Sequence, residues 1–575
     1  MHSFNLPRGR GPDSSATLRR PPASMQLLGD AVTRWISRPV IIVALAMLCA
    51  SRPGFSQSNP GRRGSIVIVT GQLGTLPIPT LIEGPAASVS NLELADQLFL
   101  RLAGLGPTLL TAGDRGFVPL LARSWTRRDS LTLVFDLDPR ARWHDGTPVT
   151  SKDVVFTIKR AKDPAIAPRL ADLLRRIESV SAEGDRRVVF RYTEPYAEQF
   201  YDATFHVAPL PAHLLDSLAP EAVARSSFVT QPVGSGPYRM ARSVAGQFVE
   251  LVANHKFFLG RPKLERVIFR AAADPEARLN LLLSGEADAI DNVVPPLENI
   301  RRINADPTLR IIPVPSPTVG FLLFNQRDPR DTARSHPVLA DIRVRRAIIL
   351  GLDRQLMARA VFGPYGVVPY GPVSPILWIR HHAPRAERQN LAEARRLLAA
   401  AGWRDSDGDG TLERSGQPLT LTLSLPNTSA IRRQFSLLVQ EQLRQLGIKL
   451  DLQQLDFPVY LERRSSGRFD IDFAGTSQDP SPSGLTQGWT CAGGTNVAKY
   501  CNPRTDSLLD QAILARGGKD PAQLWVAVLR QIEADAPAAF LYAPSYVYSV
   551  RRRFLNVAIS PTSSWQLIRT WSDGT

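Results

Sequence analysis

The chain has 575 residues, of which 43% are hydrophobic, 7% aromatic and 21% charged. This is the composition of an ordinary globular protein, so wholesale disorder is excluded. No stretch reaches the roughly 18 consecutive apolar residues that a membrane-spanning helix needs, which excludes an integral transporter. The formal net charge is +16, but the arginines are spread among acidic residues along the chain. This distribution favours solvated surfaces over nucleic-acid binding.

The first 56 residues have the pattern of an export signal. They contain seven arginines, two aspartates, an apolar run over residues 40–50 and a polar exit that ends at Ser56. A basic flank, a short apolar segment and a small-residue exit are typical of a secretory signal peptide, and Arg34 and Arg38 lie where orientation by positive charge requires them. We therefore predict a Sec-exported, periplasmic protein cleaved after Ser56. A start at Met25 is an alternative, because the leader is long.

Three cysteines occur in the chain. Cys49 raises the alternative of a lipoprotein, but Leu48 stands where a lipobox requires a small residue, so we favour cleavage without lipidation. Cys491 and Cys501 remain after cleavage, and in an oxidising compartment they are expected to form a disulfide. The alternative is a pair of buried thiols.

Strand and helix signals alternate along the rest of the chain. The β-branched run at 66–69 predicts a buried strand, the alternation over 131–137 predicts a half-exposed strand, and Thr150 or Ser151 is expected to cap a helix. Further strands are predicted at 187–192, 248–252 and 267–270, and further helices at 274–284, 341–361 and 391–401. This alternation indicates an α/β fold. Because no internal repeat or Ser/Gly-rich linker occurs, we expect interleaved domains with more than one crossing between them.

A series of short segments in fixed order resembles one family. They include Trp-His-Asp-Gly-Thr-Pro at 143–148 and Val-Gly-Ser-Gly-Pro-Tyr at 233–238. The others lie at 119–125, 151–156, 254–260, 282–288, 343–347, 352–354, 371–373, 400–403 and 500–503. Together these segments resemble the large periplasmic solute-binding proteins of ABC importers, the dipeptide, oligopeptide and nickel-binding family.

The resemblance implies a two-lobed α/β fold of the periplasmic binding protein type with an extra inserted domain. Mapped onto this chain, lobe I covers 57–92, 230–320 and 546–575, the inserted domain covers 93–229, and lobe II covers 321–545. The chain would cross between the lobes near Asn325 and Tyr546, which would form the hinge. The lobes would close around a solute and present a shape that the permease subunits recognise.

The resemblance also implies binding without catalysis. We expect a monomeric, extracytoplasmic component of an ABC importer that has no cofactor and captures a small molecule or short peptide. A peptide or peptide-like ligand is favoured; a nickel chelate, an opine or a modified sugar is the alternative. A ligand sensor and a periplasmic hydrolase are further alternatives. The eight histidines include no H-E-x-x-H motif, and Val233 breaks the G-x-S-x-G pattern of a serine nucleophile, which argues against hydrolysis.

The segment 470–480 is the candidate ligand site. In peptide-binding relatives an aspartate three residues before an Asp-Pro pair holds the α-ammonium of the ligand, because a buried ammonium without an anion is costly. Here Asp479 precedes Pro480, but the anchor position holds Thr476, which accepts a hydrogen bond without neutralising a cation. The expected ligand contacts are Thr476, Gln478, Asp479, Trp489 and Asn325.

Several of these residues have a structural alternative. Trp489 is expected to form an apolar wall of the cleft, and the alternative places it in the core of lobe II. Asn325 is expected to offer its amide to the ligand backbone at the crossing. Asp479 either compensates for the missing anchor or is a turn residue before proline. His144 is expected to have a structural role in a turn that Gly146 permits.

Two motifs suggest metal ions without meeting the full requirements. Residues 405–413 resemble a calcium loop, with oxygens at positions 1, 3 and 5 and glycine at position 6, but position 12 is Gly416. We favour a polar turn that leads into a hairpin. His381 and His382 are adjacent and have no cysteine or third histidine nearby. We therefore expect no metal site.

Overall fold

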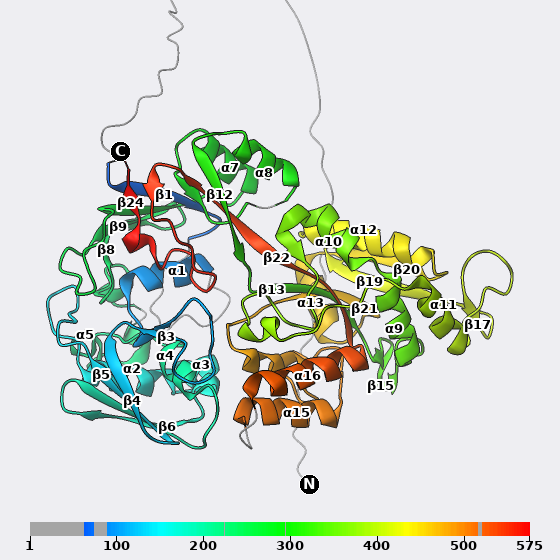
Figure 1. Cartoon of the computed structure of the whole chain (residues 1–575), viewed down its shortest axis with the longest axis horizontal. Coiled ribbons are helices and arrows are strands. Elements are labelled where there is room, and N and C mark those ends of the chain that lie inside the picture. Colours follow the sequence, from blue (N-terminus) through cyan, green and yellow to red (C-terminus); the bar gives the residue numbers. More distant parts are fainter. Residues whose placement is uncertain (1–62, 74–88, 224, 294, 516–519, 575) are drawn as a thin grey trace, which may run out of the picture. The chain divides into compact units, whose positions relative to one another are not determined.

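The computed structural model describes residues 63–73, 89–223, 225–293, 295–515 and 520–574, which belong to one compact unit (Figure 1). The predicted leader, its cleavage position after Ser56 and Cys49 lie outside the described residues. None of the helices in the described part of the chain is long and apolar enough to span a membrane.

A 12-stranded sheet organises the molecule, and β22 (Ala538–Arg551) joins its two parts. Half-sheet I consists of β1 (Ser65–Thr70), β8 (Tyr238–Val244), β9 (Phe248–Ala253), β10 (Arg266–Ala271), β11 (Ala289–Ile290) and β12 (Leu309–Pro315). Half-sheet II consists of β13 (Thr318–Phe324), β16 (Gly366–Val367), β19 (Thr420–Pro426), β20 (Lys449–Leu455) and β21 (Ile471–Ser477). Figure 1 shows β22 with β12 along one half and β13 along the other.

The smaller sheets lie outside this path. A four-stranded sheet in the order β4-β5-β7-β6 comprises β4 (Ala122–Asp129), β5 (Thr132–Leu137), β6 (Ile177–Glu183) and β7 (Arg187–Tyr192). Its residues fall within the predicted inserted domain, 93–229, which we call the inserted segment. The two-stranded pairs are β2 (Ala103–Leu105) with β3 (Phe117–Pro119), β14 (Arg327–Asp328) with β15 (Asp331–Ser335), β17 (Glu413–Arg414) with β18 (Gln417–Pro418), and β23 (Phe554–Leu555) with β24 (Ser572–Asp573).

Helices cover these sheets. Those up to β12 are α1 (Val89–Leu98), α2 (Ser151–Ala161), α3 (Pro168–Leu173), α4 (Gln199–Thr204), α5 (Ala212–Leu215), α6 (Pro220–Val223), α7 (Pro275–Leu283) and α8 (Leu297–Asn304). Those after β13 are α9 (Ile342–Gly351), α10 (Arg354–Phe362), α11 (Leu391–Ala400), α12 (Ala430–Arg444), α13 (Phe457–Ser465), α14 (Thr486–Trp489), α15 (Pro503–Leu514) and α16 (Pro521–Asp535). Short 3-10 helices include η4 (Trp378–His381) and η5 (Pro482–Leu485).

The predicted strands are present, but β5, which was predicted to be half-exposed, is almost entirely buried because it pairs with strands on both sides and its side chains join the core. The predicted helices are confirmed with one exception. The predicted helix at 341–361 is two helices, α9 and α10, because the backbone of Leu352 is extended and Asp353 caps the second helix. The carboxylate of Asp353 accepts a hydrogen bond from the backbone N–H of Leu356 at 2.9 Å. A side chain that satisfies a free N–H in this way starts a new helix at that point.

The buried side chains alternate between the two faces of the sheet. In β1, Ile66 and Ile68 join a cluster that continues into the inserted segment, whereas Val67 and Val69 pack with α7 and α8. In β13, Leu322 and Phe324 belong to one cluster and residues such as Phe321 to another. Both faces of the sheet are therefore covered, as expected for the parallel strands of an α/β fold.

Hydrogen bonds join two of the sequence motifs, those at 143–148 and 233–238. His144, in the turn after β5, accepts a hydrogen bond on Nδ1 from the N–H of Gly234 at 3.1 Å, and its Nε2 lies 3.1 Å from the carbonyl of Gly236. Burial lowers the pKa of His144 to about 4, so the ring is neutral near pH 7. The structural role that the sequence predicts for His144 is confirmed.

Candidate functional site

The parallel strands of half-sheet I and those of half-sheet II have their carboxyl ends on the side where the two half-sheets meet. In half-sheet I, β1 is parallel to β10 and β11, and β11 is antiparallel to β22. In half-sheet II, β19 is parallel to β20 and β21, and β21 has the same direction as β22 because each is antiparallel to β13. Since β22 runs from half-sheet II to half-sheet I, both sets of carboxyl ends face the crossing. Ligand sites of α/β sheets form at such ends, and we call this region the crossover edge.

The chain crosses between the half-sheets twice. The first crossing lies between Pro315, where β12 ends, and Thr318, where β13 begins, and the second lies inside β22. The hydroxyl groups of Thr318 and Tyr546 are 3.1 Å apart and tie the two crossings together. The expected crossing at Tyr546 agrees with this arrangement, whereas Asn325 lies beyond the far end of β13.

Thr476 lies at the crossover edge. It is half-buried near the carboxyl end of β21, opposite Val319 on β13. The preceding pair, Gly475 and Gly320, has no side chains, and a Cβ on Gly320 would stand 2.2 Å from the ring of Tyr542. The carboxyl end of β21 therefore lies close to β22. At the predicted anchor position it carries the hydroxyl group of Thr476, which has no charge.

Gln478 and Asp479 follow Thr476 but have different surroundings. The Gln478 side chain donates to the carbonyl of Pro372 at 2.6 Å and accepts from the N–H of Ser374 at 2.9 Å. It therefore fixes the loop at 372–374 against the strand end, and its amide is already engaged. Asp479 is exposed, and its carboxylate lies 4.0 Å from the guanidinium of Arg169 on α3.

Two of the expected ligand contacts, Trp489 and Asn325, are buried and contact other parts of the protein. Trp489 is 5% exposed and packs against Phe321 and Phe540, with ring centroids 5.7 and 5.5 Å away, so its indole belongs to the core. Asn325 is 1% exposed and donates both amide hydrogens to the carbonyls of Gly467 and Phe469, each at 2.8 Å. Ring packing thus engages Trp489 and hydrogen bonds engage Asn325 within the protein, and a ligand contact by either residue stays a prediction.

Half-sheet I brings buried acidic groups to its side of the crossing. The hydroxyl of Thr70, at the end of β1, donates to Asp291 at 2.8 Å. Loss of hydration raises the pKa of Asp291, and it raises that of Glu93, on α1, to about 8. Sequence reasoning missed both residues. The position of Asp291 directly after β11 could have indicated it, but α1 carries no signal that singles out Glu93.

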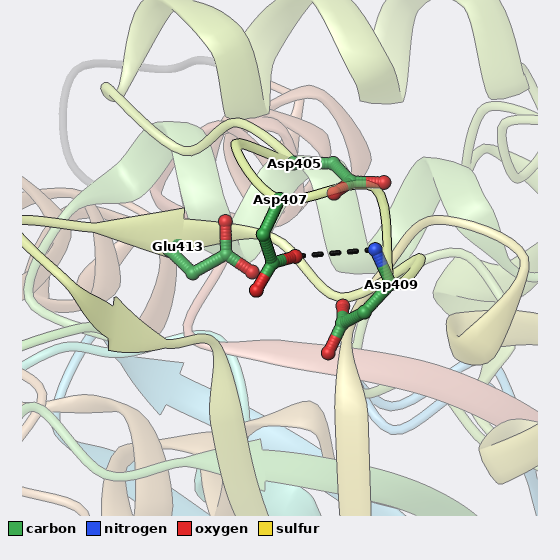
Figure 2. A group of neighbouring side chains, drawn as sticks. All are labelled: Asp405, Asp407, Asp409 and Glu413. Carbon is green, nitrogen blue, oxygen red and sulfur yellow. Dashed lines mark hydrogen bonds between the residues drawn. The ribbon is translucent and has the colours of Figure 1, made fainter.

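A cluster of carboxylates occupies the loop before β17 and the first residue of that strand. Figure 2 shows Asp405, Asp407, Asp409 and Glu413 converging, and their carboxylate oxygens lie within 4.8 Å of one another. Backbone N–H groups of the same loop donate to all four of them, for example that of Asp409 to Asp407 at 3.1 Å. Oxygen donors of this kind suit a hard cation such as Ca²⁺. The hairpin expected after this turn is present as β17 and β18.

The paired histidines do not form a comparable cluster. Both His381 and His382 are exposed at the end of η4. In the described parts of the chain, neither belongs to a group of three or more ligand-type side chains.

A disulfide joins Cys491 and Cys501, as the sequence predicts, with their Cα atoms 4.3 Å apart. Inside the closed loop the Asn496 amide donates to the carbonyls of Thr490 and Tyr500, at 2.8 and 2.6 Å. The bridge and these bonds hold the segment after Trp489 in one conformation.

Replacing both cysteines by serine should lower the free energy of unfolding by about 2–3 kcal/mol, because the bridge limits the conformations of the unfolded loop. Urea unfolding of the full chain checks this, and reductant should shift the wild type to the midpoint of the Cys491→Ser, Cys501→Ser variant. Equal stability of oxidised wild type and variant would contradict it.

Comparisons with known proteins agree with this architecture. The sequence model of the bacterial extracellular solute-binding proteins, family 5 Middle, matches residues 116–498. The oligopeptide-binding protein AppA of Bacillus subtilis is 26% identical over 526 residues, covering 88% of this chain and 92% of AppA. Its structure in complex with a nonapeptide superimposes with a TM-score of 0.69 at 23% identity, covering 89% of this chain and 99% of that one.

Two further proteins extend the comparison. The putative ABC transporter peptide-binding protein BOV_A0352 of Brucella ovis is 30% identical over 395 residues, covering 67% of this chain and 71% of the relative. NikZ of Campylobacter jejuni, whose structure contains Ni(L-His), superimposes with a TM-score of 0.71 at 21% identity, covering 89% of this chain and all (100%) of that one. These likenesses confirm the expected two-lobed α/β fold.

Proposed function

The chain belongs to the bacterial extracellular solute-binding proteins of family 5, and from that premise we propose that it captures peptides or peptide-like solutes at the crossover edge for an ABC importer. The observation that carries this proposal is the convergence of parallel-strand ends from two half-sheets on one crossing. The names of its relatives, an oligopeptide-binding protein and a peptide-binding protein of an ABC transporter, support a peptide. Export by the Sec route with cleavage after Ser56, and a monomeric state, are part of the proposal.

The proposed ligand contacts are Thr476 and Asp479. Thr476 lies at the strand end with a neutral hydroxyl group, and Asp479 is an exposed carboxylate three residues further on. Because a hydroxyl group cannot neutralise an ammonium, burial of a free peptide N-terminus against Thr476 would carry a desolvation cost that a carboxylate would offset. We therefore propose that this site does not depend on a charged N-terminus.

Native mass spectrometry of the protein purified without denaturation from the periplasm tests the ligand class. A ladder of peptide masses released from the protein supports the proposal. A nickel adduct with a small chelator would instead favour the alternative that NikZ suggests. A single organic mass without peptide bonds would overturn peptide capture.

Because Thr476 is uncharged, we expect the affinity for a peptide to depend little on the charge of its N-terminus. We expect a synthetic nonapeptide and its N-acetylated form to bind the wild type with affinities within about threefold, whereas Thr476→Asp should prefer the free amine by about tenfold, since one charged hydrogen bond contributes roughly 1.5–3 kcal/mol. Isothermal titration calorimetry with both peptides measures this difference.

Thr126→Asp is the matched control, because Thr126 is exposed on β4, within the inserted segment. It should leave both affinities unchanged. A strong preference of the wild type for the free amine would contradict the role assigned to Thr476.

A further inference from the structure

A single buried carboxylate joins the inserted segment to the part of the chain that carries half-sheet II. Glu198, the residue before α4, is 6% exposed. Thr111 donates its hydroxyl hydrogen to Oε1 of Glu198, while Ser481, at 2.5 Å, and Ser483 donate to Oε2. The indole N–H of Trp378 in turn donates to the Thr111 hydroxyl group at 3.0 Å.

The partners come from two different bodies of packed side chains. Glu198 and Thr111 belong to the inserted segment, whose core is continuous with that of half-sheet I. Ser481, Ser483 and Trp378 belong to the η5 and η4 regions, next to the second cluster of half-sheet II. Leu110 and Ala112, on either side of Thr111, pack against that cluster. The Glu198 bonds therefore lie across an interface that must change if the two bodies move apart.

The interface also borders the proposed ligand contacts. Ser481 follows Asp479 after a single proline, and Asp479 itself faces Arg169 of the inserted segment at 4.0 Å. The hydrogen bonds of Ser481 and Ser483 to Glu198 therefore restrict the position of the segment that carries Thr476 and Asp479.

Among the described residues, the largest influences on the titration of Glu198 are burial, the hydroxyl groups of Ser481, Ser483 and Thr111, and the charge of Asp202. The nearby charged group is Asp202 on α4, which accepts from the Tyr196 hydroxyl group at 2.6 Å and lies 3.4 Å from His206. Burial raises the pKa of Glu198, the charge of Asp202 adds to this, and the three hydroxyl groups oppose it. Burial thus shifts the protonation equilibrium of Glu198 toward the neutral acid, relative to a carboxyl group in water.

We propose that Glu198 is a positioning residue that clasps the inserted segment to η5 and so holds the strand end with Thr476 and Asp479 in its capture position. Only one part of this proposal rests on the proposed function, namely that Thr476 and Asp479 contact the ligand. The hydrogen bonds of Glu198 across the interface do not depend on any solute. The neutral acid donates its hydrogen to one of the three hydroxyl oxygens and accepts from the others. Protonation therefore strengthens the clasp without changing its partners.

The sign of the pH dependence follows from the burial. When the interface opens, Glu198 enters water and its pKa returns to the ordinary value of 4.5. The closed clasp therefore binds the proton more tightly than the open one. Its stabilising effect is complete below that ordinary pKa and decreases as the pH rises through the raised pKa of the closed form.

Hydrogen–deuterium exchange of the full chain, without added solute, tests the clasp directly. After correction for intrinsic exchange rates, the segments 109–116 and 481–489 of the wild type should lose protection as the pH rises above the ordinary glutamate pKa of 4.5. Glu198→Ala should exchange about tenfold faster in both segments, because three hydrogen bonds are lost. Glu198→Gln should keep its protection at every pH, because it carries no charge.

The controls separate a local clasp from general loosening. Glu178→Gln, at an exposed position on β6, should behave as the wild type. If Glu198→Ala does not fold, the double variant Ser481→Ala, Ser483→Ala gives the same test from the other side. Unchanged exchange in Glu198→Ala or in the double serine variant, or a wild-type pH trend in Glu198→Gln, would overturn the clasp.

A second measurement links the clasp to capture. For a bound synthetic nonapeptide, Glu198→Ala should dissociate about tenfold faster than wild type, with Glu198→Gln restoring the slow rate. Failure of the wild type to bind any peptide would refute the proposed function and leave the exchange result standing. Unchanged exchange with normal peptide binding would refute the clasp alone.

Discussion

Gly234→Ala should destabilise the protein by about 3 kcal/mol or more, because the added methyl group meets backbone that cannot move away. A Cβ at this position would stand 1.9 Å from the carbonyl oxygen of Leu98, at the end of α1, and 3.1 Å from Cε1 of His144. The surrounding backbone is fixed, since the N–H of Gly236 donates to the same Leu98 carbonyl at 2.8 Å and that of His144 donates to Gly234 at 2.8 Å. Urea unfolding, or the yield of folded protein, measures the effect.

Gly484→Ala provides the matched control. Gly484 is exposed in η5, and a Cβ there would meet nothing within 4 Å. Its substitution should change the free energy of unfolding by less than about 0.5 kcal/mol, as is usual for surface positions. Equal stability of the Gly234→Ala variant and the wild type would refute the close packing of the 233–238 motif against α1.

The same motif shows what a sequence can reveal. The Gly-Ser-Gly-Pro-Tyr pattern and the Trp-His-Asp-Gly turn each indicate tight local backbone, and the structure confirms this at both places. Their mutual contact through His144 joins positions 90 residues apart. Local propensity carries no information on such a pairing, so only the recurrence of both motifs in one family could have suggested it.

The candidate site residues were named on two different grounds, and their contact with a ligand stays a prediction. Thr476 was named from the resemblance to peptide-binding relatives, three residues before an Asp-Pro pair, and the structure places it near the carboxyl end of β21. Trp489 and Asn325 were chosen because aromatic and amide groups suit a ligand, but the same groups also suit a core or a backbone junction. Glu198 was missed because its partner Ser481 is 283 residues away. The roles of these three residues depend on their burial and on contacts with distant parts of the chain. Neither can be predicted from the local sequence.

Glu93→Gln should stabilise the protein increasingly as the pH rises. Burial, with a contribution from the charges of Asp291 and Asp96, raises the pKa of Glu93 to about 8, against hydrogen bonds from Ser564 that lower it. The folded state therefore binds the proton more tightly than the unfolded state, whose pKa is about 4.5. Wild-type stability decreases as the pH rises between these values. The glutamine variant lacks this loss, which reaches an upper limit of roughly 5 kcal/mol near pH 8.

Urea unfolding of wild type and Glu93→Gln at about pH 5, pH 6.5 and pH 8 gives the difference directly, since other titrating groups contribute equally to both proteins. The two stabilities should be similar near pH 5, and the gap should widen toward pH 8. Glu298→Gln, on the exposed surface of α8, should run parallel to the wild type throughout. Parallel curves for Glu93→Gln as well would mean that Glu93 is ionised in the folded protein, and a cation or water would then have to reach the buried end of half-sheet I. A widening gap instead shows that Glu93, on α1, is protonated in the folded protein at pH values where the unfolded chain has released that proton.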